Sequence, residues 1–365
     1  MFELTNRQRK CFGLPAVTDL WERIEVSQSP YDAFSTFAYL DGNRVKKVVL
    51  VCESDSDSAQ YREIQVDVLL SDDRKTILPK TEKGKPKPLS SSNLLKCSAV
   101  GMSLNYAAGN VIVANETSRQ SYYESYYDDL NLNGFSSFEK WVEDWCADTG
   151  DEELRDIGKF SAAERVHQKY REGDFFRFRI NRILYGYGRI LIDFGKMRKA
   201  KVPFWDIFMG KPLCVAVYHI ATERDDVTPE ELVGLRTLPS QMIMDNKFFY
   251  GEYAIIGNMP VPQDYRDYPI HYGHTISVLE TGVRYQCGKT FISLYDEQEL
   301  YGQYRNGGIG WNLNVKLPIL QKCINAHSNQ PYWELSSPYR TDQDLRNPKL
   351  YERLQEIRRQ VGIDT

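Results

Sequence analysis

Runs of alternating apolar and polar residues dominate the first third of the chain. Residues 34–40 and 45–52 form two such runs on either side of Asp41-Gly42-Asn43, and an Asp-Gly pair between apolar runs is a specific hairpin signal. Further runs at 61–70, 76–78, 99–106 and 110–116 have the same character. We therefore expect antiparallel hairpins in this part of the chain.

A second series of expected strands begins after Gly173. Phe176, Phe178 and Ile180 alternate with Arg177 and Arg179, which predicts a half-buried strand with two guanidinium groups on its polar face. Further strands are predicted at 189–194, 213–220, 253–256, 276–279, 284–286, 291–295 and 312–317.

Helical spacing occurs at a few places only. Phe138, Trp141, Val142 and Trp145 fall on one face of a helix that should close the first domain, and 161–170 reads as a second helix with a Ser161–Glu164 capping box. A terminal helix is expected between Asn347, Pro348 and Gly362, and short helices at 203–209, 229–234 and 318–326.

These elements predict an α+β fold with two β-rich domains, each built from antiparallel sheets with few helices, and a C-terminal helix. A length of 365 residues also favours two domains. We place an antiparallel β domain with its closing helix at 1–150, a helical linker at 151–172, an α+β domain at 173–327, and a tail with a helix at 328–365.

Composition is that of a globular protein, with 42% apolar and 26% charged residues and no apolar run long enough to span a membrane. The N-terminal residues lack the pattern of a signal peptide. Seven scattered cysteines without a CxxC argue against a disulfide framework or structural zinc. We expect a soluble cytoplasmic protein with reduced thiols and no membrane contact.

Charge is unevenly distributed although the net charge is only −4. Residues 139–156 carry eight acids against Lys140 and Arg155, and residues 223–231 form a second acidic stretch. Residues 165–201 carry eleven bases against three acids, and 74–87 carry six bases against Glu82. Such runs are ordinarily solvated faces, but a charge-segregated surface can also select a partner.

Sequence signatures of catalysis are missing. There is no GxSxG, no phosphate-binding GxxxxGK[ST], and no pair of histidines at helical spacing. His271 and His274 lie near Pro269 and Gly273, which predicts a turn and not a metal site. We expect no catalytic residues, no metal and no cofactor.

Two stretches are unusual in composition. Residues 121–129 hold four tyrosines and three acids, a composition favoured at recognition surfaces but also compatible with core packing. Residues 177–182 hold three arginines, which suit phosphate contacts but also fit a strand with a solvated face.

Four short motifs in the second half resemble the bacterial immunity protein 26 family of polymorphic toxin systems. They are Glu172-Gly173-Asp174-Phe175-Phe176, then 185–191 with its Tyr-Gly-Arg-aliphatic run, the strand 211–217, and Ile255-Ile256-Gly257-Asn258-Met259-Pro260. The resemblance covers roughly residues 173–326. It implies a protein that binds a toxin and catalyses nothing, and it carries over no functional residue.

The first half resembles the single-stranded-DNA-binding whirly fold, in which a Lys-Gly-Lys motif lies between strands as Lys83-Gly84-Lys85 does here. Pro86 and Pro88 depart from that motif. The resemblance implies the architecture more securely than DNA binding.

We therefore predict a monomeric immunity protein that neutralises a cognate toxin, a basic nuclease and possibly an RNase, by occluding its active or substrate-binding face. Acidic and tyrosine-rich surfaces would bind such a toxin and compete with nucleic acid. Two alternatives stay open, a single-stranded nucleic-acid-binding protein using Lys80, Lys83, Lys85, Lys87 and 177–182, and an enzyme with a site assembled from distant residues. The predicted toxin-binding residues are Tyr122, Tyr123, Glu124, Tyr126, Tyr127, Asp128, Asp129, Glu143, Asp144, Asp148, Asp151, Glu152, Glu153, Asp225, Asp226, Glu230 and Glu231.

Overall fold

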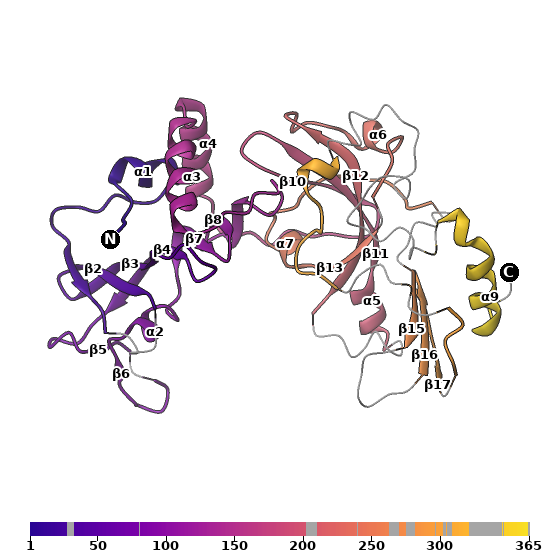
Figure 1. Cartoon of the computed structure of the whole chain (residues 1–365), viewed down its shortest axis with the longest axis horizontal. Coiled ribbons are helices and arrows are strands. Elements are labelled where there is room, and N and C mark those ends of the chain that lie inside the picture. The colour runs from indigo at the N-terminus through magenta and orange to yellow at the C-terminus, as the bar shows by residue number, and fades with distance from the viewer. Residues whose placement is uncertain are drawn as a thin grey trace. The chain divides into compact units, whose positions relative to one another are not determined.

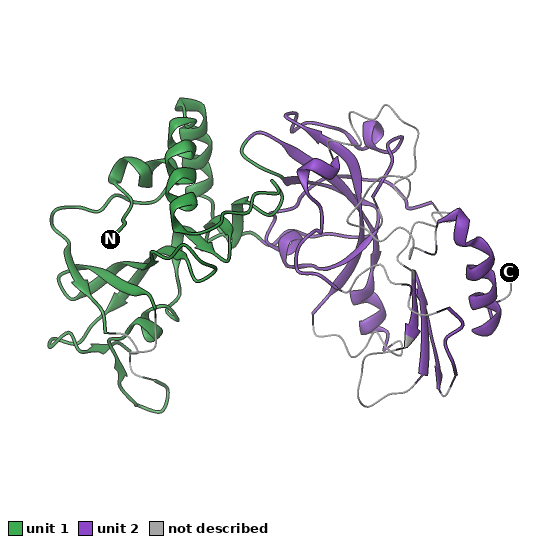
Figure 2. Cartoon of the chain, viewed as in Figure 1, with its two compact units in different colours: residues 1–166, 180–182 green, residues 167–179, 183–365 purple. Residues whose placement is uncertain are grey.

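The computed structural model describes most of the chain, which divides into two compact units (Figures 1 and 2). Unit 1 comprises residues 1–166 with 180–182, and unit 2 comprises 167–179 with 183–365. The domain boundaries expected from the sequence stay predictions. The described residues are 1–27, 33–79, 81–201, 210–238, 240–262, 270–274, 282–295, 297–301, 304, 309–320, 345 and 347–363.

Unit 1 is built on a seven-stranded antiparallel sheet in the order β1-β2-β3-β4-β7-β8-β9. Consecutive strands mostly pair as hairpins, as the alternating runs and Asp-Gly turn predict. The strands are β1 (Glu22–Glu25), β2 (Ser35–Asp41), β3 (Arg44–Cys52), β4 (Gln60–Leu69), β7 (Val100–Ala107), β8 (Asn110–Asn115) and β9 (Gln120–Glu124).

Both faces of this sheet are covered. On one face α1 (Asn6–Cys11), α3 (Phe135–Ala147) and α4 (Asp151–Ser161) pack on a core that includes stacked Tyr106 and Phe138, whose ring centroids are 4.6 Å apart. The other face holds a smaller core that reaches α2 (Ser91–Leu94). The short β5 (Thr76–Ile77) and β6 (Lys87–Pro88) pair with each other as a separate ribbon.

Unit 2 contains a five-stranded antiparallel sheet in the order β13-β12-β11-β10-β14. Its strands are β10 (Asp174–Arg179), β11 (Tyr185–Asp193), β12 (Pro212–Thr222), β13 (Gln241–Met244) and β14 (Ala254–Asn258), and its short helices are α5 (Phe194–Lys199), α6 (Pro229–Leu232) and α7 (Asn246–Phe249).

A second sheet of unit 2, in the order β15-β16-β17, packs against the C-terminal helix. It consists of β15 (Ile270–His274), β16 (Gly282–Cys287) and β17 (Thr290–Tyr295), and it is followed by the 3-10 turn η4 (Pro348–Leu350) and α9 (Tyr351–Gln360). Asn347 caps this last segment, because its side chain accepts a hydrogen bond from the Lys349 N–H. The predicted α+β class, with antiparallel sheets, few helices and a terminal helix, is confirmed.

Three local predictions are wrong. Residues 163–170 form neither helix nor strand, and α4 ends at Ser161. Residues 312–316 form no strand, and 317–320 begin a helical turn. His271 and His274 lie in β15 and not in a turn. The helix predicted at 203–209, the strand at 276–279 and most of the helix at 318–326 lie outside the described residues.

Candidate functional site

The tyrosine-rich stretch lies mainly in the core of unit 1. Tyr122, Tyr123 and Tyr127 are buried, and Glu124 is buried with them. The Tyr123 ring stacks on Trp141 of α3 with centroids 5.8 Å apart, and burial raises its pKa, together with Asp128. The prediction that these four side chains form an open binding surface is therefore wrong, because all four are buried within the protein.

The rest of that stretch is more accessible. Tyr126 and Asp128 are half-buried, and Asp129 is exposed. The Asp128 carboxylate accepts hydrogen bonds from the Tyr123 hydroxyl at 3.3 Å and from the Asn181 amide at 3.0 Å. Asp128 is therefore held in place by the fold.

The predicted acids on helices α3 and α4 do form an exposed face. Glu143, Asp144, Asp148, Asp151 and Glu152 are all exposed. Asp144 is partly neutralised by Lys140, whose ammonium lies 3.0 Å from its carboxylate.

Glu153, the sixth predicted acid of these helices, has a structural role at the start of α4. Its carboxylate accepts a hydrogen bond from the Gly150 N–H at 2.9 Å. Backbone hydrogen bonds from Glu153 and Gly150 lower the pKa of this carboxyl. Glu153 therefore stabilises the helix start and is less suited than its neighbours to contact a partner.

Three carboxylates that are not among the predicted toxin-binding residues extend this acidic face. Glu53, Asp55 and Glu139 line a recess of about 430 Å³ beside the start of α3. Partial burial and then the nearby Glu53, Glu143 and Asp55 raise the pKa of Glu139. Glu53 and Asp55 lie between strands β3 and β4, and sequence spacing gives no signal that places them beside α3.

The second predicted acidic stretch is the segment 223–231 of unit 2, and its backbone is firmly anchored. The Tyr187 hydroxyl donates to the Arg224 carbonyl at 2.6 Å, and Arg177 donates to the Asp225 carbonyl. Val227 and Leu232 are buried in the core below it.

The carboxylates of this stretch pair largely with arginines of the same unit. Arg177 lies 3.1 Å from the Asp225 carboxylate, and Arg224 lies 3.0 Å from Asp226 and 2.7 Å from Glu231. The Arg224 hydrogen bond holds the pKa of Glu231 at about 2. Glu230 is exposed and has no ion pair in the described part of the chain.

The arginine-rich stretch is engaged by the protein itself. Arg177 pairs with Asp225 and lies over the Tyr185 ring, with 4.8 Å from its Cζ atom to the ring centroid. Arg182 lies 4.1 Å above the Trp145 ring and donates to the Thr149 hydroxyl at 2.9 Å. These contacts leave less guanidinium surface for phosphate than the sequence suggests.

The lysine-rich stretch is different. Lys83 and Lys85 are exposed at the turn between β5 and β6, and Lys87 is half-buried. They form no ion pair with any residue that the structure describes, and Lys80 lies outside the described residues.

Short motifs from distant parts of the chain meet at one end of the large sheet of unit 2. Gly173 adopts a φ of +90°, and a Cβ atom there would lie 2.2 Å from the Met259 carbonyl oxygen. The Asn258 amide donates to the buried Asp174 carboxylate at 2.7 Å, in register with the strand pairing of β10 and β14. The Gly-Asp and Asn-Met-Pro motifs therefore form one structural joint.

Arg189 completes this joint from strand β11. Its guanidinium is buried and donates to the carbonyls of Met259 and Pro260, both at 2.7 Å. It also lies over the Phe175 ring, 4.6 Å from the centroid. The arginine of the Tyr-Gly-Arg motif therefore fixes the backbone that follows β14.

The glycines of the same motif make room for aromatic rings. Gly186 and Gly188 pair across the strands with Phe178 and Phe176. A Cβ atom on either glycine would lie 2.3 Å from the ring of its partner. Close packing against these rings therefore explains why glycines stand at these motif positions, and no catalytic role is needed.

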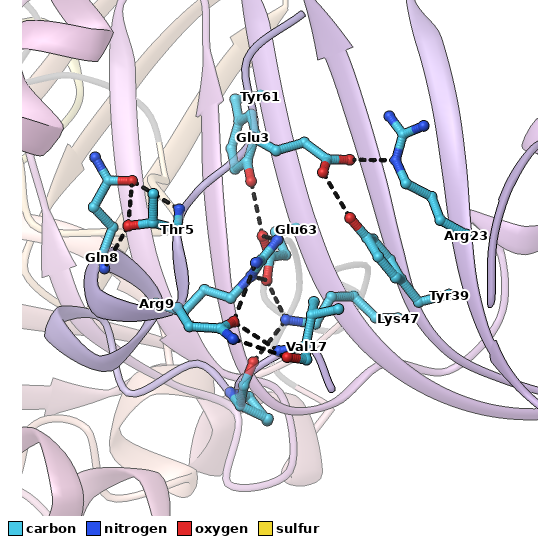
Figure 3. A network of polar contacts seen from close by, with 12 residues as sticks. Glu3, Thr5, Gln8, Arg9, Val17, Arg23, Tyr39, Lys47, Tyr61 and Glu63 are labelled. Atoms are coloured by element: carbon cyan, nitrogen blue, oxygen red, sulfur yellow. Dashed lines mark hydrogen bonds and ion pairs between the residues drawn. The ribbon is translucent and has the colours of Figure 1, made fainter. Parts of the chain in front are cut away.

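Unit 1 contains a buried ionic cluster, shown in Figure 3. The Glu63 carboxylate accepts hydrogen bonds from Arg9 at 2.9 Å, from the Tyr61 hydroxyl at 2.7 Å, and from Lys47. Lys47 also donates to the Pro15 carbonyl at 2.8 Å. The cluster ties the N-terminal segment to strands β3 and β4.

Charge balance within the cluster sets its protonation. The cations Lys47 and Arg9 lower the pKa of Glu63 although burial opposes this, and burial lowers the pKa of Lys47. Burial and the Glu63 charge raise the pKa of Tyr61. Arg9, Lys47 and Tyr61 all donate to the one Glu63 carboxylate, so we interpret the arrangement as structural.

Chemistry of other kinds finds no support in the geometry. Within the described ranges no group of three or more His, Cys, Asp or Glu side chains is arranged to hold a metal ion. None of the helices described is long and apolar enough to cross a membrane.

Comparison with known proteins gave one match. Neither the curated proteins nor the solved structures contain a match to the chain. The likeness of the first half to the whirly fold stays a prediction. Residues 171–282, which carry all four motifs of the second half, match the model of the family immunity protein 26 and identify this segment as similar to the immunity proteins of toxin systems.

Proposed function

We propose that this protein binds a cognate toxin and neutralises it stoichiometrically, by covering the active or substrate-binding face of the toxin. The observation that carries this proposal is the match of residues 171–282 to immunity protein 26. Occlusion requires affinity and no turnover, in keeping with motif residues such as Arg189 and Gly188 that are used for packing. We propose accordingly that the protein is not an enzyme.

The toxin that fits best is a basic nuclease such as an RNase. Nucleases that bind phosphate backbones present positive surfaces, and each unit of this chain presents a set of exposed carboxylates. Such carboxylates would accelerate the encounter and compete with nucleic acid for the same surface of the toxin. The exposed residues of the proposed interface are Asp129, Glu143, Asp144, Asp148, Asp151, Glu152, Asp225, Asp226, Glu230 and Glu231.

The proposal expects a toxin domain to be encoded by the reading frame directly upstream, and that domain provides the test. Co-expression with this chain should restore growth, and the two proteins should co-purify as a 1:1 complex of one copy each. After separation in guanidinium chloride and refolding, adding the chain back should inhibit the toxin at equimolar concentration. If the purified toxin keeps its full activity with excess chain present, the proposal is wrong. We propose a cytoplasmic location and a monomer in the free state, and size-exclusion chromatography with light scattering tests the latter.

Charge reversal tests whether the exposed acids of α3 and α4 (the α3–α4 face) bind the toxin or only contact solvent. Asp148→Lys with Glu152→Lys should slow association about tenfold at low salt, because charge at the interface mainly changes the association rate. The matched control is Asp72→Lys with Glu82→Lys, which reverses two exposed acids elsewhere in unit 1. Equal association rates for both double variants would show that the α3–α4 face only meets solvent.

A second candidate function is binding of single-stranded nucleic acid, favoured by the exposed Lys83 and Lys85. Fluorescence anisotropy with a labelled oligonucleotide across a salt series tests it, because affinity from phosphate contacts falls steeply with ionic strength. Lys83→Gln with Lys85→Gln should reduce both the affinity and the salt slope if these lysines contact phosphate.

A further inference from the structure

The segment 223–236 of unit 2 combines apolar and acidic side chains on an exposed surface. Val233 and Leu235 are 53% and 40% exposed and are separated by one residue only. The segment as a whole carries five acids and two arginines. Exposed apolar side chains next to charged ones in one short segment are a composition that suits a protein–protein contact.

The same segment is held rigidly from below. Tyr187 and Arg177 fix the carbonyls of Arg224 and Asp225, and Thr228 with Glu231 forms the capping box of α6. Pro229 packs so closely on β14 that a Cβ atom on Gly257 would lie 2.5 Å from its Cγ atom. The segment therefore presents its side chains from one fixed backbone.

Internal arginines also set the directions of its carboxylates. Arg177 orients Asp225, and Arg224 orients Asp226 and Glu231. Glu223 and Glu230 are exposed and form no ion pair in the part of the chain described here. Two carboxylates and two apolar side chains are thus left to face a partner.

We propose that the segment 223–236 is a pre-ordered docking element for a cationic protein surface, with Arg177 and Arg224 as its positioning residues. This rests on the proposed function, and it assigns the toxin contact to the unit that holds the immunity protein 26 match. The partner surface has Lys or Arg opposite Glu223 and Glu230 and an apolar contact for Val233 and Leu235. Pre-ordering favours affinity because less conformational entropy is lost on binding.

The first experiment removes the contacts themselves, with the refolded toxin domain from the upstream reading frame as the probe. Val233→Ser with Leu235→Ser should weaken binding at least about tenfold, mainly through faster dissociation. Glu223→Lys with Glu230→Lys should slow association about tenfold at low salt. If both double variants bind the toxin with the affinity and association rate of the wild type, the assignment is overturned.

The second experiment tests whether Arg177 acts by orienting Asp225 or only by its own charge. Arg177→Gln removes a positive charge and makes the surface more acidic, so charge alone predicts tighter binding to a cationic toxin. Release of Asp225 predicts weaker binding, by about three- to tenfold and with faster dissociation. Lys211→Gln is the matched control. It removes one exposed charge just before the start of β12, whereas the segment 223–236 follows the end of that strand.

Arg224→Gln provides an independent variant if Arg177→Gln fails to fold, which thermal denaturation reveals. Tighter or unchanged binding by both arginine variants would overturn the positioning role. Failure of the wild-type chain to bind the toxin overturns the proposed function itself. If the wild-type chain binds the toxin and every variant of the segment 223–236 binds it with the same affinity, only this inference is overturned.

Discussion

Replacing Glu63 by glutamine tests whether the buried ionic cluster stabilises unit 1. The side chains of Glu63 and Lys47 are fully buried, and that of Arg9 is 5% exposed. Glu63→Gln keeps the size of the side chain but raises the net charge of the three groups from +1 to +2. An amide also accepts through one oxygen only, so at least one of the donors Arg9, Lys47 and Tyr61 loses its acceptor.

The expected cost is about 3–5 kcal/mol, the usual loss when one partner of a buried ion pair is removed. Typical domains are stable by only about 5–15 kcal/mol, so unit 1 should become marginal. Lys47→Met is the informative comparison. Lys47→Met leaves the Arg9–Glu63 pair with no net charge and replaces the ammonium by apolar atoms. We therefore expect it to lower the free energy of unfolding by less than half as much as Glu63→Gln does.

Urea denaturation combined with hydrogen exchange of the β3 and β4 amides measures the effect in unit 1. The expected order of stability is wild type, then Lys47→Met, then Glu63→Gln. A loss below about 1 kcal/mol for Glu63→Gln would refute the reasoning, because an exposed ion pair typically contributes that little.

The pH dependence follows from the lowered pKa of Glu63. A carboxyl with a lowered pKa in the folded state stabilises the fold above its unfolded pKa of about 4.3, and this contribution is lost as the pH falls through the folded value. The stability difference between wild type and Glu63→Gln should therefore be largest near neutral pH and shrink on acidification. A difference that is constant from pH 7 to pH 3 would contradict a charged Glu63.

Three predictions concern unit 2 and the helices. Gly188→Ala should cost about 1–3 kcal/mol through overpacking against Phe176, whereas Gly158→Ala, in an open helix position of α4, should stabilise by about 0.5–1 kcal/mol; urea denaturation compares them. Arg189→Met should lose about 1–3 kcal/mol in the same assay, because the part-buried carbonyls of Met259 and Pro260 lose their donor. Gln168→Ala removes three side-chain hydrogen bonds and should speed proteolysis at 163–172, while wild type stays protected.

Local signals predicted most of the strands. The Asp-Gly turn and the alternating runs of unit 1 specify hairpins whose partners are neighbours in sequence, and β2 and β3 pair accordingly. Asn347, Pro348 and Gly362 likewise marked the terminal helix. In these cases the interactions that determine the structure lie within a few residues of one another.

The helix predicted at 161–170 failed because distant partners outweighed a local cap. Gln168 donates to the carbonyls of Phe248 and Tyr253 and accepts from the Ile255 N–H, and the Tyr170 hydroxyl bonds to Asp245. These side-chain bonds, together with the Gln168 N–H that donates to the Phe249 carbonyl at 2.8 Å, hold the segment in a non-helical path, and no sequence pattern predicts them. The buried tyrosines failed for a related reason, because a ring with a polar tip suits core and surface equally.

The acidic segment of unit 2 shows how far charge counting reaches. Its composition was visible in the sequence, but Arg177 lies 48 residues from Asp225, and their pairing was not. Counting charges in the sequence therefore overestimated the number of carboxylates available to a partner, because three of the predicted carboxylates form ion pairs within the unit. The neighbouring Val233 and Leu235 were missed, because their exposure depends on where α6 ends.

The family motifs and the binding surface make different demands on the chain. Gly173, Gly188 and Arg189 each make close backbone or ring contacts, so these residue types serve the packing of this sheet. A residue that selects one toxin must instead be accessible and free to differ between relatives. The match to immunity protein 26 over residues 171–282 therefore rests on motifs that build the sheet. In the proposed complex, specificity for a particular toxin falls to the exposed segment 223–236, which contains none of the four motifs.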